Sequence, residues 1–220
     1  MSTALMRTVP AEWYGEDYFT GKTSNYRGGY TWEQYQGTFE ALAQLLMQSF
    51  PTARRFLDFG CAKGFLVQAL HDQGLDAWGI DHSAYAISQA REDVRALLVC
   101  ASLDSCAFVA GADVTVATEV LEHLTHEQLQ VYLRHLAQST ELALFATVPM
   151  PSMRHRGAWA EAQEEPSHVT LQDRAWWHGL LRETGWRVGP MECLAERYFM
   201  NHPLVRTTGW NPLLASAPHG

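Results

Sequence analysis

The sequence predicts an α/β fold: an open, doubly wound, mostly parallel sheet of about seven strands, with an antiparallel edge and an N-terminal helical arm. Two observations predict it. From Arg54 onward, short apolar runs alternate with segments whose apolar residues recur at helical spacing, which is typical of parallel strands joined by crossover helices. A glycine turn in LDFGCAKGFL (57–66) joins the first apolar run to the first helical pattern.

The expected elements follow one another along the chain. A helix over 31–50 carries one apolar stripe, and strands are expected over 54–58, 76–80, 96–100, 113–118 and 142–148. Helices are expected over 63–73, over 83–93 with Ser83 as N-cap, and over 125–138, which opens with a capping box from Thr125 to Gln128. These elements alternate as a parallel sheet requires.

The last third of the chain is expected to close the sheet. Pro149 ends the fifth strand, and a loop rich in polar and breaker residues fills 150–168. A helix then starts from Thr170 and ends at Gly185. The runs 186–199 and 210–217 are expected to form two last strands, paired antiparallel at one edge.

Length and composition bound the class of protein. The 220 residues suit one domain at 51–220 with an arm and helix at 1–50. A formal charge of −8 argues against nucleic-acid or anionic-membrane partners. The four cysteines show no CxxC pair, so neither a disulfide framework nor a zinc site is expected. No apolar run resembles a signal peptide or a membrane span, which predicts a soluble, cytoplasmic protein.

The glycine turn limits the kinds of ligand that the protein can be expected to bind. A dinucleotide fingerprint would place glycines where Ala62 and bulky Phe65 stand, and the lysine of a P-loop is missing after Gly64. The stretch instead reads acid-x-Gly-x-x-x-Gly, with Asp58 placed for an ammonium group and the helix start for a carboxylate. At the end of the second strand, Asp81 is placed to accept hydrogen bonds from both hydroxyls of a ribose. An amino acid joined to a nucleoside meets both demands, as S-adenosylmethionine does.

Four motifs in this order resemble those of the class I S-adenosylmethionine-dependent methyltransferases, especially the small-molecule enzymes of the quinone-biosynthesis type. They are LDFGCAKG (57–64), GIDHS (79–83), ASLD (101–104) and ADVTVATEVLEHL (112–124). The resemblance implies a Rossmann-like fold over about 54–188 and a site for S-adenosylmethionine, with S-adenosylhomocysteine as product. It implies roles at Gly60 and Gly64 for methionine, Asp81 for ribose, His82, Ser102, Leu103 and Asp104 for adenine, and Glu119 for the methionine amino end.

The aromatic arm before residue 31 is expected to close over the cofactor as a lid, with Tyr18, Tyr26 and Tyr30 in contact with it. The alternative is that these rings only pack the arm onto the sheet. Segments before the first strand often cover the cofactor in the enzymes that the chain resembles.

Methyl transfer needs alignment of the reacting atoms and, for many acceptors, removal of a proton. His123, after the fourth strand, and His168, in the loop before the helix at 170, are the expected bases. Glu122 is expected either to orient His123 or to be solvated, and no metal site is expected from the spacing of ligand-type residues.

The expected acceptor is oxygen or nitrogen of a small molecule, such as a sugar or specialised metabolite. Two alternatives remain: transfer to carbon or a carboxylate without a base, and a cofactor-binding module without catalysis. A homodimer is left open.

Overall fold

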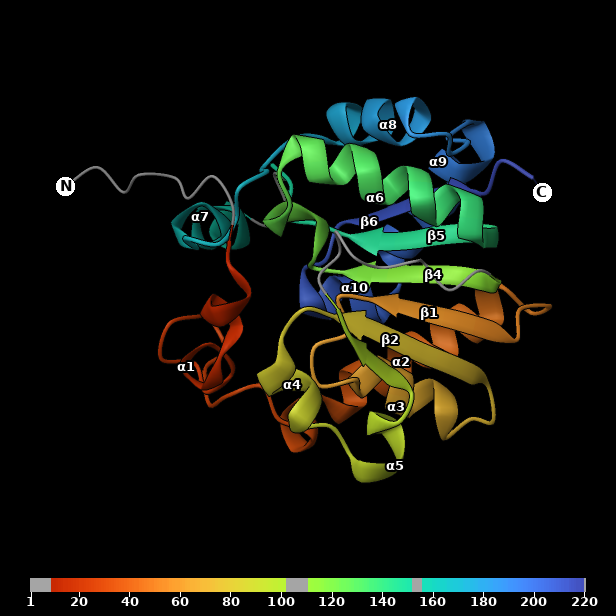
Figure 1. Ribbon diagram of the computed structural model, residues 1–220. Coiled ribbons are helices and arrows are strands. Elements are labelled where there is room, and N and C mark those ends of the chain that lie inside the picture. The colour runs from red at the N-terminus through yellow and green to blue at the C-terminus, as the bar shows by residue number, and fades with distance from the viewer. Residues whose placement is uncertain (1–8, 102–110, 152–155, 220) are drawn as a thin grey trace. The chain divides into compact units, whose positions relative to one another are not determined.

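The computed structural model describes residues 9–101, 111–151 and 156–219 (Figure 1). Its described strands form a six-stranded sheet in the order β3-β2-β1-β4-β5-β6. Their bounds are β1 Arg55–Phe59, β2 Asp76–Asp81, β3 Leu98–Cys100, β4 Ala112–Thr118, β5 Thr140–Thr147 and β6 Pro212–Ser216. The pairs β1–β2, β1–β4 and β2–β3 are parallel, and β5–β6 is antiparallel. The predicted α/β sheet with an antiparallel edge is therefore confirmed, with six described strands rather than about seven.

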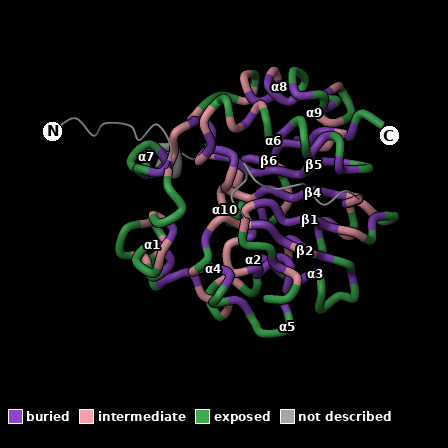
Figure 2. The backbone as a smooth tube through the Cα atoms, viewed as in Figure 1, coloured by how far each residue is buried: buried purple, intermediate pink, exposed green. Residues whose placement is uncertain are grey.

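The chain divides into two compact units, and the first spans Pro10–Val116. Besides β1, β2, β3 and most of β4 it contains η1 Ala11–Tyr14, α1 Glu16–Phe19, α2 Trp32–Ser49, α3 Phe65–His71, α4 Ala84–Ser88 and α5 Glu92–Arg95. Within it, α2 packs on α3, and α3 packs on β1 and β2. Strand β1 is buried from Phe56 to Phe59 (Figure 2), as a central parallel strand must be.

The helix expected over 83–93 is broken in two. Ser83 caps α4 as predicted, because its hydroxyl accepts a hydrogen bond from the Ala86 N–H at 3.0 Å. Arg91, between α4 and α5, is not helical, with ψ of 139°, and its guanidinium donates to the carboxylates of Asp72 and Asp93. The ion pairs thus lie at the point where the chain leaves the helical path.

The second unit begins at Ala117 and contains the end of β4, then β5 and β6. Its helices are η2 Leu121–His123, α6 His126–Ser139, α7 Arg156–Glu164, α8 Arg174–Glu183, α9 Pro190–Asn201 and α10 Pro203–Thr208. The predicted capping box of α6 is present, with Thr125 and Gln128 bonding each other's backbone N–H groups. Helix α8 is capped by Asp173 rather than Thr170, and α7 lies where only a loop was expected.

The strand expected over 186–199 is wrong. Only Arg187 makes an isolated antiparallel bridge, to Ser216, and the chain then enters α9. Pro190 at the first helical turn and Glu192, whose carboxylate accepts the Gly189 N–H at 2.9 Å, start this helix. The local start signal outweighed the apolar run.

Among the described residues, none of the helices combines the length and hydropathy needed to cross a bilayer.

Candidate functional site

The glycine turn between β1 and α3 is built as its sequence predicted. Gly60 and Gly64 both have left-handed backbones, with φ of +79° and +72°. The Gly60 N–H donates to the Ile80 carbonyl at 2.8 Å, which holds the turn against the end of β2. A Cβ atom at Gly64 would lie 2.8 Å from Leu98 Cδ1, so glycine is required there for packing as well as for conformation.

Ala62, which stands where a dinucleotide fingerprint has glycine, also has a left-handed backbone. Ala62 has φ +48°, which is uncommon for a residue with a side chain. Its N–H donates to Asp81 Oδ2 at 2.8 Å, and the Ser83 N–H donates to Asp81 Oδ1 at 2.8 Å. These two bonds orient the carboxylate of Asp81 at the end of β2, and a carboxylate has about four acceptor positions in all.

Two carboxyl groups face the turn from neighbouring strands. Asp58, on β1, is only 4% exposed, and burial, followed by the negative charge of Asp81, raises the pKa of Asp58 to about 8. Burial also raises the pKa of Asp81, although the N–H groups of Ser83 and Ala62 oppose the shift. A cation beside Asp58 would relieve both effects, which fits the ammonium group of an amino-acid ligand.

The aromatic arm is attached to the same turn within this unit. Tyr30 stacks on Phe65, the first residue of α3, with ring centroids 4.6 Å apart. The Lys63 ammonium donates to the Tyr30 carbonyl at 2.8 Å and lies 5.6 Å from the ring centroid of Phe19. Sequence reasoning gave Lys63 no role, because a contact with a residue more than thirty positions away leaves no local signal.

The tyrosines named from the sequence lie in one cluster. The ring centroid of Tyr26 is 5.5 Å from that of Tyr18 and 4.8 Å from that of Tyr30. His82 packs against Tyr14, with centroids 4.9 Å apart. The rings therefore pack the arm together, and their contact with a cofactor stays a prediction. Ser102, Leu103 and Asp104 lie outside the described residues.

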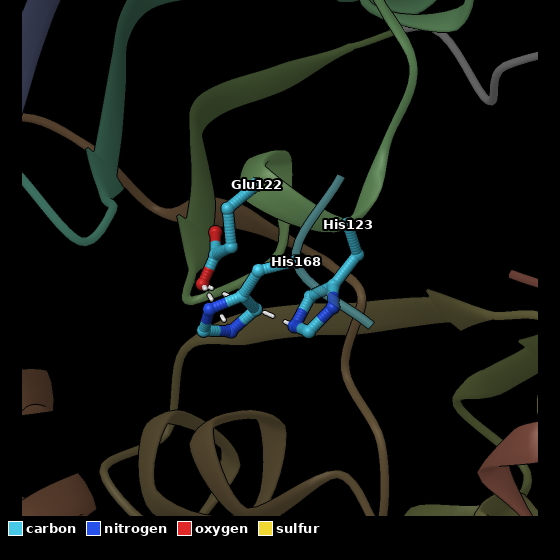
Figure 3. A group of neighbouring side chains, drawn as sticks. All are labelled: Glu122, His123 and His168. Carbon is cyan, nitrogen blue, oxygen red and sulfur yellow. Dashed lines mark ion pairs between the residues drawn. The ribbon is translucent and has the colours of Figure 1, made fainter. Parts of the chain in front are cut away.

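A second group of titratable side chains follows β4 in the other unit, and Figure 3 shows three of them pointing toward one another. Glu122 Oε1 lies 3.9 Å from His168 Nε2 and 4.0 Å from His123 Nε2. The structure thus brings together the two expected bases, although 44 residues separate them in the chain. Glu122 lies beside both and is fully buried, so the solvated alternative does not fit, and its orienting role stays a prediction.

Backbone hydrogen bonds bring these side chains together. The Glu122 carbonyl accepts the N–H groups of Val169 and Thr170, both at 2.9 Å. His123 Nδ1 lies 3.1 Å from the Ser167 carbonyl, and His168 Nδ1 lies 2.8 Å from the Ala162 carbonyl. Both imidazoles are therefore held through Nδ1, with Nε2 directed at Glu122.

Burial dominates the electrostatics of this cluster. Glu122 is fully buried, and burial, reinforced by the charge of Glu119, raises the pKa of Glu122 well above its ordinary value. Burial raises the pKa of Glu119 to about 7, while a hydrogen bond from Thr147 opposes the shift. Burial also lowers the pKa of His168. Each group resists becoming charged by itself.

Glu119 has a strained backbone, with φ +53° directly after β4. Its N–H donates to the Thr147 carbonyl at 3.0 Å, which ties the turn to the end of β5. Its buried Oε1 has no hydrogen-bond partner among the described residues. The structure does not test its expected place near the methionine amino end.

Comparison with known proteins places the chain in a family. A family model described as a methyltransferase domain matches residues 31–189. The chain belongs to this family of methyltransferases, which confirms the resemblance to the class I enzymes and S-adenosylmethionine as the cofactor of that class. A search of curated proteins found no match to the chain.

Solved structures share the fold at low identity. A protein of Nostoc punctiforme PCC 73102, provisionally named an O-methyltransferase, has a TM-score of 0.62 and 14% identity over 83% of this chain, which spans only 56% of that protein. An S-adenosylmethionine-dependent methyltransferase of Archaeoglobus fulgidus has a TM-score of 0.58 and 16% identity over 84% of this chain and 97% of its own. Magnesium protoporphyrin IX methyltransferase of Synechocystis PCC 6803, solved with S-adenosylhomocysteine, has a TM-score of 0.57 and 14% identity, covering 81% and 88%.

Proposed function

We propose that this protein transfers the methyl group of S-adenosylmethionine to an oxygen or nitrogen atom of a small molecule, such as a sugar or a specialised metabolite. The observation that carries the proposal is the pair of acids at the glycine turn. Buried Asp58 suits an ammonium group, and oriented Asp81 suits the hydroxyls of a ribose. Family membership supports the reaction, and the named substrate of the Synechocystis enzyme is a precedent for a small acceptor.

The other residues receive roles within this proposal. Gly60 and Gly64 would let the backbone approach the methionine part, and His82 would lie near the adenine with Ser102, Leu103 and Asp104. The tyrosines of the arm would cover the cofactor, and Glu119 would lie near the methionine amino end. The 1–50 arm would then act as a lid on the 51–220 domain.

The cluster of Glu122, His123 and His168 would activate the acceptor. Ligands of open α/β sheets bind beyond the carboxyl ends of the strands, and this cluster follows the carboxyl end of β4. An imidazole whose Nε2 carries the lone pair can take the proton of a hydroxyl as the oxygen attacks the methyl carbon. Glu122 would orient the rings as a positioning residue.

Calorimetry tests the cofactor half of the proposal. We expect heat of binding with S-adenosylmethionine and S-adenosylhomocysteine and none with NAD, because Ala62 and Phe65 replace two glycines of the dinucleotide fingerprint. Methyl-labelled cofactor offered with a library of sugars and specialised metabolites tests the acceptor half. Binding without label transfer to any member of the library would favour the non-catalytic alternative.

Substitution of both histidines tests the role of the cluster. We expect His123→Asn combined with His168→Asn to lower turnover by about 100-fold or more, since proton transfer typically contributes 10²–10⁴-fold. Affinity for S-adenosylhomocysteine should not change. His126→Asn, an exposed histidine at the start of α6, is the matched control. Unchanged turnover in the double variant would favour transfer to carbon or a carboxylate.

A further inference from the structure

The donor atoms around Glu122 are all electron-pair donors. Each histidine Nδ1 contacts a backbone carbonyl, which can only accept, so in the neutral ring Nδ1 carries the proton and Nε2 the lone pair. Both carboxylate oxygens of Glu122 are buried without a hydrogen-bond partner among the described residues. Three groups therefore converge on one point, and when Glu122 is ionised none of them can supply a proton to the others.

Such an arrangement is costly when nothing occupies its centre. A buried polar group without a partner costs about 1–3 kcal/mol, and a buried carboxylate costs more. A single proton on Glu122 does not resolve this cost, because Oε1 lies 3.9 Å from His168 Nε2 and 4.0 Å from His123 Nε2, too far for a hydrogen bond. A divalent cation could accept electron pairs from the carboxylate and from both imidazoles at once, because both residue types are common ligands of such ions.

We propose that Glu122, His123 and His168 bind a divalent transition-metal ion such as Zn²⁺ or Mn²⁺. Their ligand atoms all lie within 4.8 Å of one another. Ligands at bond lengths of about 2.0–2.1 Å in a tetrahedral site are about 3.4 Å apart, so contraction by about 1 Å through side-chain rotation completes the site. The carbonyls at Nδ1 are the outer-sphere acceptors that metal-binding histidines almost always have.

Glu119 offers a further oxygen donor on the same segment. It precedes Glu122 by three residues, in the turn that directly follows β4. The unpartnered Oε1 of Glu119 makes it the candidate for a fourth ligand. The strained backbone at this residue is typical of positions held for a ligand.

The metal also gives the proposed reaction a way to activate an alcohol, and this part of the inference rests on the proposed function. A hydroxyl bound at an open metal position loses its proton more readily, as metal-bound water does. The proton leaves to solvent, the oxygen forms a bond to the methyl carbon, and the carbon–sulfur bond breaks with its electron pair on sulfur. The acceptor is thereby an oxygen nucleophile, and activation by the metal takes the place of the proton transfer to an imidazole in the proposed function.

Metal binding is tested on the full chain after treatment with a chelator. Titration with Co²⁺, followed by its visible absorption and by calorimetry, should show one ion per chain with imidazole ligands. Glu122→Gln and His168→Gln should each weaken Co²⁺ binding by about 100-fold or more, and His126→Gln should not change it. No stoichiometric Co²⁺ binding, or equal binding by all four proteins, would overturn the proposal.

A second measurement needs no variant that might fail to fold. Crystals of the wild-type protein soaked with Mn²⁺ should give an anomalous peak between the three side chains of Figure 3. A peak only elsewhere, or none, overturns the site.

The two proposals fail in different ways. Methyl transfer that survives exhaustive chelation, but is lost in the double histidine variant, would support the proposed function and overturn the metal site. Stoichiometric metal binding at the cluster without any methyl transfer would support the metal site and overturn the proposed function.

Discussion

At Gly64, both backbone conformation and side-chain packing favour glycine. Its backbone is left-handed, and an added Cβ would be 2.8 Å from Leu98 Cδ1 and 3.2 Å from Val94 Cγ1. Gly74, in the turn before β2, has nearly the same φ of +77° but nothing within 4 Å of its Cβ position. The two glycines therefore separate the cost of backbone strain from the cost of crowding.

We expect Gly74→Ala to lower the free energy of unfolding by about 1 kcal/mol through backbone strain alone. Gly64→Ala should cost about 1–3 kcal/mol more, because the methyl group must displace Leu98 and Val94. Urea unfolding of both variants measures the difference. Equal losses would mean that the core around Leu98 accommodates the methyl group without strain.

Asp58 is the residue whose charge should depend on the cofactor. Its pKa of about 8 keeps it protonated below that pH in the free protein. The ordinary pKa of an aspartate is about 3.9, so the unfolded chain loses this proton near pH 4 and the folded protein keeps it until about pH 8. This group therefore makes the free protein less stable as the pH rises through that window, the reverse of an ion-paired carboxylate.

Binding of an ammonium group should expel this proton, since a neighbouring cation favours the carboxylate. Between pH 5.5 and 7, where the ligand amine is charged, affinity for S-adenosylhomocysteine should rise by up to about tenfold per pH unit. Calorimetry in buffers of different ionisation enthalpy measures the protons released. Asp58→Asn should bind more weakly and release none, whereas unchanged release would assign the proton to another group.

At the scale of elements, one buried carboxylate joins α8, α9 and β6. Glu196 on α9 accepts hydrogen bonds from Arg174 Nη1 at 2.6 Å and from the Leu214 N–H at 2.9 Å, and its Oε1 lies 3.0 Å from His178 Nε2. Arg174 and His178 belong to α8, and Leu214 belongs to β6. This network holds α9 against α8 and against the edge strand β6.

Glu196→Ala should lower the free energy of unfolding by about 3 kcal/mol, because it leaves buried donors unpaired. The partial exposure of Arg174 places the value at the low end of the range for buried pairs. Glu183→Ala, at the exposed end of α8, should change it by less than about 0.5 kcal/mol. Thermal unfolding of the two variants measures the difference. Similar melting temperatures would show that the Glu196 network does not stabilise the fold.

The elements also show where sequence patterns suffice. The capping box of α6 and the Ser83 cap of α4 were predicted because a cap is decided by residues within one turn. The apolar run 186–199 misled because buried helices and buried strands are both apolar, and here Pro190 and Glu192 decided for a helix. Helix α7 was missed because the sequence around it is polar and carries breakers.

At the scale of the whole molecule, the alternation of strands and helices predicted a mostly parallel sheet. Sequential parallel strands need crossover helices, so the pattern from Arg54 onward sufficed for β1 to β5. The strand order reverses direction between β1 and β4, and open α/β sheets bind their ligands at such a switch point. A glycine turn at the end of β1 and an acid at the end of β2 were therefore enough to predict the cofactor.

The sequence by itself determined the fold class, the left-handed glycine turn and the neighbouring acids Asp58 and Asp81, because each depends on local conformation or on adjacent parallel strands. Only the tertiary structure decided that His168 meets Glu122 and His123. That contact depends on backbone hydrogen bonds from Val169 and Thr170 to the Glu122 carbonyl, across a long stretch of chain. Spacing along the sequence carries no trace of such a contact, because the distance in space is decided by how the intervening elements pack.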